Sequence, residues 1–387
     1  MDELNLDTNI EAIEAKIQRG SLAIYSKAPL KILSSAVLNG GLRDANWIVS
    51  VHVPENGSKD EEVHRNPEQF LREEVSRMNI SADEVVGLMT AASLQNVVVT
   101  NLRYYDMSLS ALVTAGTSVS ATAGDEITSN QRSFKPKKFG TINIILLVDG
   151  NLTQSCMVGA INTITEAKTV ALRELDIRSR FSGDIASGTI TDSVAVACTK
   201  RGKPIEYAGT ISILGELIGK SVRESVKKAI YKQERLVPSR SLTKRLEERG
   251  ISIEKMVTVF SQIHPEIKGN AEKLRQFKEE FQRIISDQKL ASLIIALLRL
   301  DDDTKIGLIP ETSTITSNEQ TAVCEILQTT VADYLPHEKS NSRNGLFDHQ
   351  SLNMAENIGP LTRNVLFTVM TKVYSSIYCK YSQDRPL

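Results

Sequence analysis

A short turn in the middle of the chain, SGTITDS at residues 187–193, gathers side chains that are suited to chemistry. Thr189, Thr191 and Asp192 stand immediately before the apolar segment VAVAC, which has the composition of a buried strand. Hydroxyls and a carboxylate at one end of a strand can bind a polar substrate and activate water. The same residues also suit a local turn in which the side chains only satisfy neighbouring backbone groups. The sequence leaves both interpretations open.

Lys168 lies on the apolar face of a helix that we predict from about Leu152 to Asp176. The other residues of this face recur at steps of three, four or eight: Met157, Ile161, Ile164, Leu172 and Leu175. A buried, unpartnered ammonium is costly, so Lys168 must reach solvent or bind Asp192, Glu216 or a substrate group. If the charge serves function alone, its removal should leave stability equal or higher. Glu166 lies on roughly the opposite side, where a solvated carboxylate is the simpler interpretation.

Two further segments combine glycine with polar residues. In EYAGTISILGELIG, Gly209 and Thr210 suit a tight strand-to-helix turn, and Glu216 falls near the first turn of the next helix, where a carboxylate also complements the helix dipole. In SSAVLNGGLRDA, Asn39 precedes Gly40, and Asn-Gly indicates a hairpin. Backbone amides beside glycine can also approach an anion closely.

Two domains are expected from the pattern of elements. Up to about Tyr231, short β-branched segments alternate with helical patterns, which favours an α+β or α/β sheet domain. The segments that we predict as strands are LAIYS, KILSSAV, WIVSVHV, NVVVTNL, SALVTAG and TINIILLVDG. After the polar connection RLVPSRS almost every segment has a helical pattern, including LTKRLEERG, SIEKMVTVFSQI and KLASLIIALLRL. We therefore place a sheet domain at residues 1–235 and an all-helical domain at residues 241–387.

Composition excludes several function classes. The chain has 387 residues, with 46 Lys and Arg against 47 Asp and Glu, so no excess positive charge is present to bind nucleic acid. The acidic N-terminus and the short apolar runs predict a soluble, cytoplasmic protein without a membrane span. Four cysteines and five histidines are scattered, without metal-ligand spacing, and a sheet position explains His52. No GxxxxGK[ST], HExxH or GxSxG motif occurs.

Six segments of the first domain together resemble the adenosylcobinamide amidohydrolase family. They are, in order, SSAVLNGGL, VGLMTAA, GTINIILLVDGNLT, TEAKTVAL, SGTITDSVAVA and YAGTISILGELIG, and the resemblance covers about Ser21 to Tyr231. It implies hydrolysis of the amide that joins the aminopropanol arm of adenosylcobinamide, which yields adenosylcobyric acid in cobalamin salvage. Ile190 is bulkier than the small residue that is usual in the family's turn.

The remainder, from about Ser241, resembles the α-ribazole phosphatase domain that is related to phosphatidylglycerophosphatase A. The segments SLTKRLEERGISIEKMV and LRLDDDTKIGLIP carry this resemblance. The family's Asp-Glu pair falls on TAVCEILQ, where Glu325 is kept and Cys324 replaces the aspartate. A Mg²⁺ site built on that pair would lose one ligand charge, so we expect this domain to be altered or inactive.

Amide hydrolysis needs an activated nucleophile, a proton for the departing amine and a donor to the oxyanion. Without a visible triad we expect an activated water, with Asp192 or Glu216 as its base, and no cofactor. Lys168 is expected as electrostatic partner or proton donor, and Thr191, Asn39 or backbone amides as oxyanion donors. The expected substrate contacts are Asn39, Gly40, Glu166, Thr189 and Thr210.

Three alternatives remain open. A thiol nucleophile at Cys156 is weakened because no histidine is near in sequence, and a core cysteine is commoner. A corrinoid-binding module without catalysis would not need the carboxylates that the chain retains. A bifunctional amidohydrolase and phosphatase is weakened by Cys324. The sequence leaves homo-oligomerisation undecided.

Overall fold

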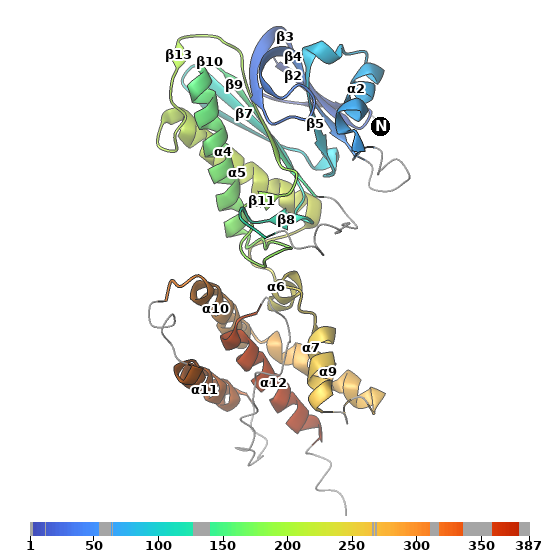
Figure 1. Cartoon of the computed structure of the whole chain (residues 1–387), viewed down its shortest axis with the longest axis vertical. Coiled ribbons are helices and arrows are strands. Elements are labelled where there is room, and N and C mark those ends of the chain that lie inside the picture. Colours follow the sequence, from blue (N-terminus) through green and yellow to red (C-terminus); the bar gives the residue numbers. More distant parts are fainter. Residues whose placement is uncertain are drawn as a thin grey trace, which may run out of the picture. The chain divides into compact units, whose positions relative to one another are not determined.

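The chain folds into two compact units, Met1–Pro238 and Ser239–Leu387. The computed structural model describes residues 3–11, 13–53, 63, 65–126, 140–264, 267, 269–309, 317–335 and 358–378; for 263, 317–325 and 378 it describes the backbone alone. The first unit is rich in strands and the second is built from helices (Figure 1). The polar segment HEKSNSRNGLFDHQSLN, residues 337–353, lies outside the described residues.

The first unit is organised around a nine-stranded mixed sheet. Seven strands follow the order β1-β2-β3-β12-β9-β7-β6, while β4 pairs with β3 and β5 pairs with β4. The strands are β1 (Leu4–Leu6), β2 (Ile13–Gln18), β3 (Ser21–Ser34), β4 (Gly41–His52), β5 (Val85–Thr90), β6 (Val98–Tyr104), β7 (Met107–Ala115), β9 (Ile142–Asp149) and β12 (Ser193–Cys198). Two short pairs lie outside it, β8 (Ser120–Ala121) with β11 (Gly188–Thr189) and β10 (Asn151–Leu152) with β13 (Pro204–Ile205).

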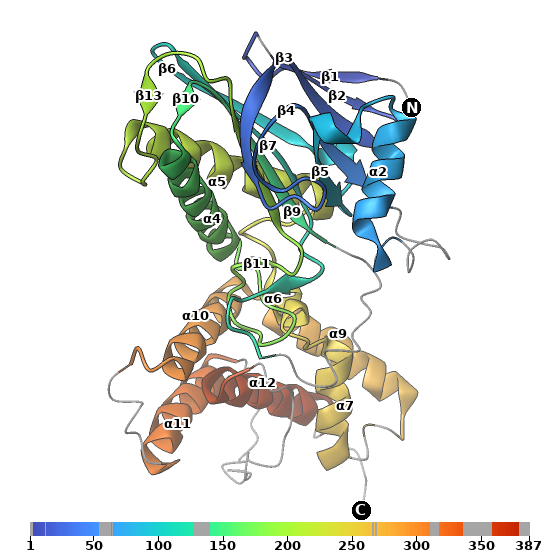
Figure 2. The same ribbon diagram turned by 45° about the horizontal axis from the view of Figure 1, so that its top comes forward.

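Both faces of the central strands are buried, which explains their almost uninterrupted apolar sequences. On β9, Ile144 and Leu146 belong to the core that is shared with helices α4 (Gln154–Glu174) and α5 (Ile213–Glu234). The alternate residues Ile145 and Leu147 belong to a second core, together with residues of β2, β3, β4 and β5. A third, smaller core lies between β4, β5 and helix α2 (Pro67–Arg77). The strands are thus enclosed between α4 and α5 on one side and α2 on the other (Figure 2).

The prediction of two strands at LAIYS and KILSSAV is wrong, because both belong to the single 14-residue strand β3. Its first half pairs with β2 and its second half pairs with β12, and the register with β4 shifts between Tyr25 and Leu30. Such a shift bends a strand and lets it serve both parts of a curled sheet. The hairpin predicted at Asn39 and Gly40 is confirmed, since β3 and β4 are antiparallel and Ser34 faces Gly41.

The helices α4 and α5 are present as predicted, and each begins with a capping hydroxyl. The hydroxyl of Thr153 accepts a hydrogen bond from the backbone N–H of Cys156 at 3.2 Å at the start of α4. The hydroxyl of Ser212 does the same for Gly215 at 3.0 Å at the start of α5. These bonds satisfy amides that the first turn of a helix leaves unpaired.

The second unit consists of helices around an aromatic core. They are α6 (Leu242–Glu248), α7 (Ile253–Ile263), α9 (Ala271–Ile285), α10 (Gln288–Lys305), α11 (Ser317–Tyr334) and α12 (Pro360–Tyr378). Phe260 stacks on Phe277 with ring centroids 5.5 Å apart, and both side chains are fully buried. Within the described residues, none of the chain's helices combines the length and the apolar character needed to cross a membrane.

Candidate functional site

Asp192 is held by four hydrogen bonds that come from three elements. Its Oδ1 accepts from the backbone N–H of Ile142 at 3.1 Å and from the hydroxyl of Thr189 at 2.5 Å. Its Oδ2 accepts from the backbone N–H of Thr189 at 3.1 Å and from the ammonium of Lys168 at 2.5 Å. The carboxylate therefore closes its own turn, as the local interpretation requires, and also binds the start of β9 and the helix α4.

Lys168 is buried in the apolar face of α4, as its spacing indicated, and it forms an ion pair with Asp192. The exposed fractions of the two side chains are 10% and 13%. The alternative in which Lys168 extends to solvent is therefore wrong. Asp192 is the one partner that the ammonium has among the described residues, so two of its three N–H groups remain available for a substrate.

Gly188 makes the close approach of this ion pair possible. A Cβ atom on Gly188 would lie 2.4 Å from Oδ2 of Asp192 and 2.8 Å from Nζ of Lys168. Both separations are shorter than any ordinary nonbonded contact of a carbon atom. A side chain at 188 would therefore displace the two charged groups from their present positions.

We expect Gly188→Ala to lower the free energy of unfolding of the first unit by roughly 1–3 kcal/mol, the usual range for an added group without space. Trp47, in β4, is the one tryptophan of the chain, so its fluorescence follows unfolding of this unit alone. The control is Gly219→Ala in α5, where a Cβ meets nothing within 4 Å. Alanine there should stabilise the helix by up to about 1 kcal/mol. Equal unfolding curves for the two variants would contradict this account.

Segments that lie far apart in the sequence meet around the ion pair. The side-chain amide of Asn143, on β9, donates to the carbonyl of Met89, on β5, at 2.6 Å. The hydroxyls of Ser35, which follows β3, and Ser193, at the start of β12, are 3.2 Å apart. The first five of the six segments on which the resemblance rests therefore contribute residues to one end of the sheet.

The tip of the turn is exposed while its base is fixed. Thr191 is exposed, and its hydroxyl has no hydrogen-bond partner in the part of the chain that the structure describes. Its carbonyl accepts from the hydroxyl of Thr141 at 2.8 Å, and the backbone N–H of Ile190 donates to Val119 at 3.3 Å. The Thr191 hydroxyl is therefore held in place by its backbone and remains free to meet a ligand.

Glu216 is separate from this arrangement. Its carboxylate is 59% exposed and pairs with Lys220, one turn along α5, instead of with Lys168. Thr210 is exposed in the turn before α5, and Glu166 is exposed on α4 as the sequence indicated. None of the four hydrogen bonds to Asp192 comes from these residues. Of the two candidate bases, the structure brings only Asp192 together with Lys168.

Asn39 uses its side chain within the protein. Its amide nitrogen donates to the carbonyls of Ala82 at 2.6 Å and Val85 at 2.8 Å, and its φ of 58° is in the left-handed region. A Cβ on Gly40 would lie 2.4 Å from the carbonyl oxygen of Ala36. This pair therefore shapes the connection between β3 and β4, and the Asn39 amide is already engaged as a donor.

The thiol nucleophile considered at Cys156 is not supported. Cys156 is 1% exposed in the core between α4 and the sheet. Burial, and to a smaller extent the neighbouring Cys198, raises the pKa of this thiol to about 11. A group that stays protonated and inaccessible at neutral pH cannot attack an amide.

Sequence spacing gives no signal for two residues that support the turn. One is Gly188, within the turn itself, and the other is Glu234, at the end of α5. The Glu234 carboxylate accepts from the backbone N–H and the hydroxyl of Thr117, both at 2.5 Å. Thr117 precedes β8, which pairs with Gly188 and Thr189. Glu234 thus supports the turn from a position more than 40 residues away.

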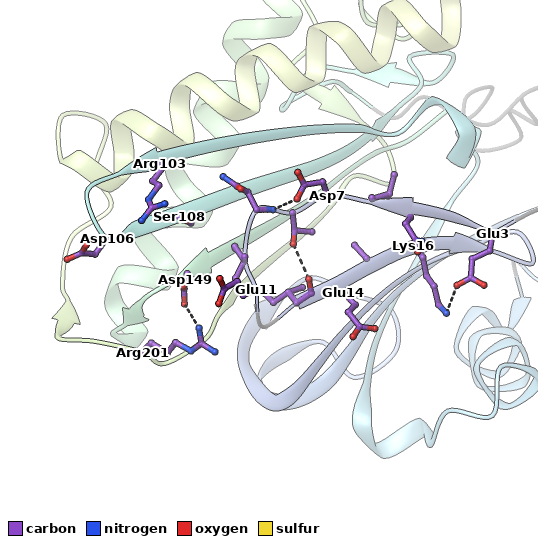
Figure 3. A pocket seen from close by; sticks show the side chains of 17 residues that line it. Glu3, Asp7, Glu11, Glu14, Lys16, Arg103, Asp106, Ser108, Asp149 and Arg201 are labelled. Carbon is purple, nitrogen blue, oxygen red and sulfur yellow. Dashed lines mark hydrogen bonds and ion pairs between the residues drawn. The ribbon is translucent and has the colours of Figure 1, made fainter.

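A polar cavity of about 860 Å³ opens at the opposite end of β9 (Figure 3). Residues of β1, β2 and the β6–β7 connection line it, together with Asp149 and Arg201. Arg201 lies 3.7 Å from Asp149, and Lys16 lies 2.7 Å from Glu3. None of the site residues expected from the sequence lines this cavity.

In the second unit the motif LRLDDDTKIG has a structural role. Asp301 is buried, and its carboxylate accepts from the backbone N–H groups of Leu361 at 3.1 Å and Thr362 at 2.9 Å, at the start of α12. Burial raises the pKa of Asp301. Glu325 and Cys324 belong to α11, but their side chains lie outside the described residues. Among the side chains that are described, no group of three or more His, Cys, Asp or Glu is arranged to hold a metal ion.

The sequence model of the adenosylcobinamide amidohydrolase family matches residues 4–238. The chain belongs to this family. The adenosylcobinamide amidohydrolase of Methanosarcina mazei is 33% identical over 202 residues, which are 50% of this chain and 86% of that protein. An uncharacterized protein of Methanocaldococcus jannaschii is 32% identical over 230 residues, 56% of this chain and 88% of that protein. The family match and the Methanosarcina mazei relative indicate that this member of the family is an amidohydrolase.

Among solved structures, a Pyrococcus horikoshii OT3 protein is similar at 13% identity and a TM-score of 0.28, over 61% of this chain and 82% of that one. A likeness at this level carries no argument about the chain.

Proposed function

We propose that the chain hydrolyses the amide between the corrin and the aminopropanol arm of adenosylcobinamide, in cobalamin salvage. The observation that carries the proposal is the buried ion pair of Lys168 and Asp192, beside the exposed hydroxyl of Thr191. A fixed carboxylate, a cation with free N–H groups and a free hydroxyl together provide a base, an electrostatic partner and a donor.

In the proposed reaction Asp192 is the base. The hydroxyl of Thr189 rotates away from Oδ1 of Asp192, and a water takes its place. The water oxygen bonds to the amide carbon while its proton passes to Asp192. Lys168 and Thr191 donate to the developing oxyanion. The proton then moves to the departing nitrogen as the C–N bond breaks, so that a carboxylic acid and an amine leave.

The remaining expected contacts have narrower roles in this proposal. Thr189 orients Asp192, and Asn39 and Gly40 shape the edge of the site without donating to the substrate. Glu166, Thr210 and Glu216 are solvent-exposed and stay outside the reacting groups. Every step uses side chains of the chain itself and needs no cofactor.

The direct test incubates the full chain with adenosylcobinamide and follows adenosylcobyric acid and aminopropanol by mass spectrometry. Both products should appear in equal amounts. A protein that only binds corrinoids would retain intact adenosylcobinamide without releasing the amine, and this outcome would reject the proposal in favour of the binding module.

For the second unit we propose an α-ribazole phosphatase-like domain whose activity is reduced by Cys324. Wild-type protein should hydrolyse α-ribazole phosphate poorly at every Mg²⁺ concentration. Cys324→Asp should raise both the rate and the affinity for Mg²⁺, because a carboxylate is a hard oxygen ligand and a neutral thiol is not. Assays of both proteins over one Mg²⁺ titration check this. Robust Mg²⁺-dependent turnover by the wild type would instead make the chain bifunctional.

A further inference from the structure

Strand register lines up three polar side chains at the cavity of Figure 3. Arg103 on β6 pairs with Ser108 on β7, and Ser108 pairs with Asp149 on β9. Paired residues on neighbouring strands present their side chains to the same face of a sheet. A guanidinium, a hydroxyl and a carboxylate therefore stand in one row across three strands, and all three residues line the cavity.

The middle member of this row has an unused hydroxyl. Ser108 is 9% exposed and lines the cavity. Its hydroxyl forms no hydrogen bond with any residue of the described part of the chain. The hydroxyl oxygen is not among the fully buried polar atoms, so it is open to a partner from the cavity that Ser108 lines.

The charges around the cavity are also unbalanced. Four lining carboxylates have no cationic partner among the described residues, those of Asp7, Glu11, Glu14 and Asp106. Arg103 is a lining cation that has no carboxylate partner among the described residues. Its guanidinium donates only to the carbonyl of Tyr105, at 3.0 Å. The cavity is therefore negative overall, and its hydrogen-bond donors include the guanidinium of Arg103 and the hydroxyl of Ser108. It suits a cation that also carries groups able to both donate and accept hydrogen bonds.

We propose that this cavity binds the amide-bearing edge of a cationic corrinoid, at a site separate from Lys168 and Asp192. The choice of a corrinoid rests on the proposed function. Adenosylcobinamide carries a net positive charge because it lacks a phosphate, and primary carboxamides surround its ring. A carboxamide donates to carboxylates such as Asp149 and accepts from Ser108 and Arg103, which are the groups in the row.

The two sites cannot share one corrinoid molecule. Ile142, which binds Asp192, and Asp149 stand at opposite ends of β9, eight residues in length. With the usual rise per residue of a β-strand, these two ends are on the order of 20 Å apart, and the packed core of the sheet separates them. The cavity therefore holds a second corrinoid.

The test is corrinoid binding to the full chain, with aquacyanocobinamide as the cationic probe and dicyanocobinamide as the neutral one. Hydrogen exchange should show protection of residues 3–16 and 103–108 by the cation. Glu14→Gln combined with Asp106→Asn should weaken this protection, with the dissociation constant raised roughly tenfold. Ser108→Val should weaken it as well, without a loss of stability, because its hydroxyl has no partner to lose. Asp83→Asn removes an exposed carboxylate away from the cavity and should bind as the wild type does.

Protection confined to residues 165–195, or equal binding by the cavity variants and the wild type, would overturn the inference. Stronger binding of the neutral probe would overturn it too. The same protein samples are assayed for hydrolysis of adenosylcobinamide. Cavity binding without hydrolysis would reject only the proposed function, whereas hydrolysis without cavity binding would reject only this inference.

Discussion

Asp192→Asn is expected to slow hydrolysis of adenosylcobinamide by at least about a hundredfold, the usual scale for loss of a general base. An amide cannot take a proton from water at neutral pH. It also cannot accept on both of its atoms, so its NH₂ group would face either the N–H donors or the ammonium of Lys168. Four hydrogen bonds reach the carboxylate, so the variant should lose stability as well as activity.

The control must separate these two losses. Asp176→Asn changes a second buried carboxylate of the same unit, which accepts from Arg178 at 3.0 Å and 2.6 Å. Initial rates of both variants are measured by mass spectrometry at a temperature at which Trp47 fluorescence shows a folded first unit. Only Asp192→Asn should lose activity under these conditions. Near-normal turnover would remove Asp192 from the reaction, and equal losses in the two variants would make its role structural.

Lys168→Met should destabilise the first unit by about 3 kcal/mol, since it leaves the largely buried carboxylate of Asp192 without its cation. This reverses the expectation from the sequence that removal of the ammonium would leave stability equal or higher. Hydrolysis should also fall, because the same ammonium is the proposed donor to the oxyanion. Unfolding by urea, followed by Trp47 fluorescence, gives the free energy directly.

Lys220→Met is the matched control, because it removes a lysine from another helix of the same unit and breaks an exposed pair, with Glu216. Exposed pairs of this spacing contribute about 0.3–0.5 kcal/mol, so this variant should unfold almost as the wild type does. The double variant Lys168→Met with Asp192→Asn should lose less free energy of unfolding than the two single variants lose together. Full additivity, or unchanged stability in Lys168→Met, would show that the ion pair is not formed in solution.

Local sequence was sufficient to predict much of the fold. The helices α4 and α5, the hairpin after β3, and the change to helices after about residue 240 follow from periodicity and turn chemistry, which act over a few neighbours. The long strand β3 was divided in two, since its bend depends on pairing with β2, β4 and β12, partners that no local pattern reveals.

The candidate site could also be predicted only in part from the sequence. Residue types alone identified the turn with Asp192 and the anomalous charge of Lys168, because a buried ammonium demands a partner wherever the chain folds. Only the tertiary structure selected that partner, by placing α4 against the turn where Gly188 leaves room. The tertiary structure also places Glu216 in an exposed pair with Lys220. It brings Arg103, Ser108 and Asp149 side by side on three neighbouring strands. Such choices depend on strand register and helix packing, which are set by burial over the whole unit and leave no signal in local spacing.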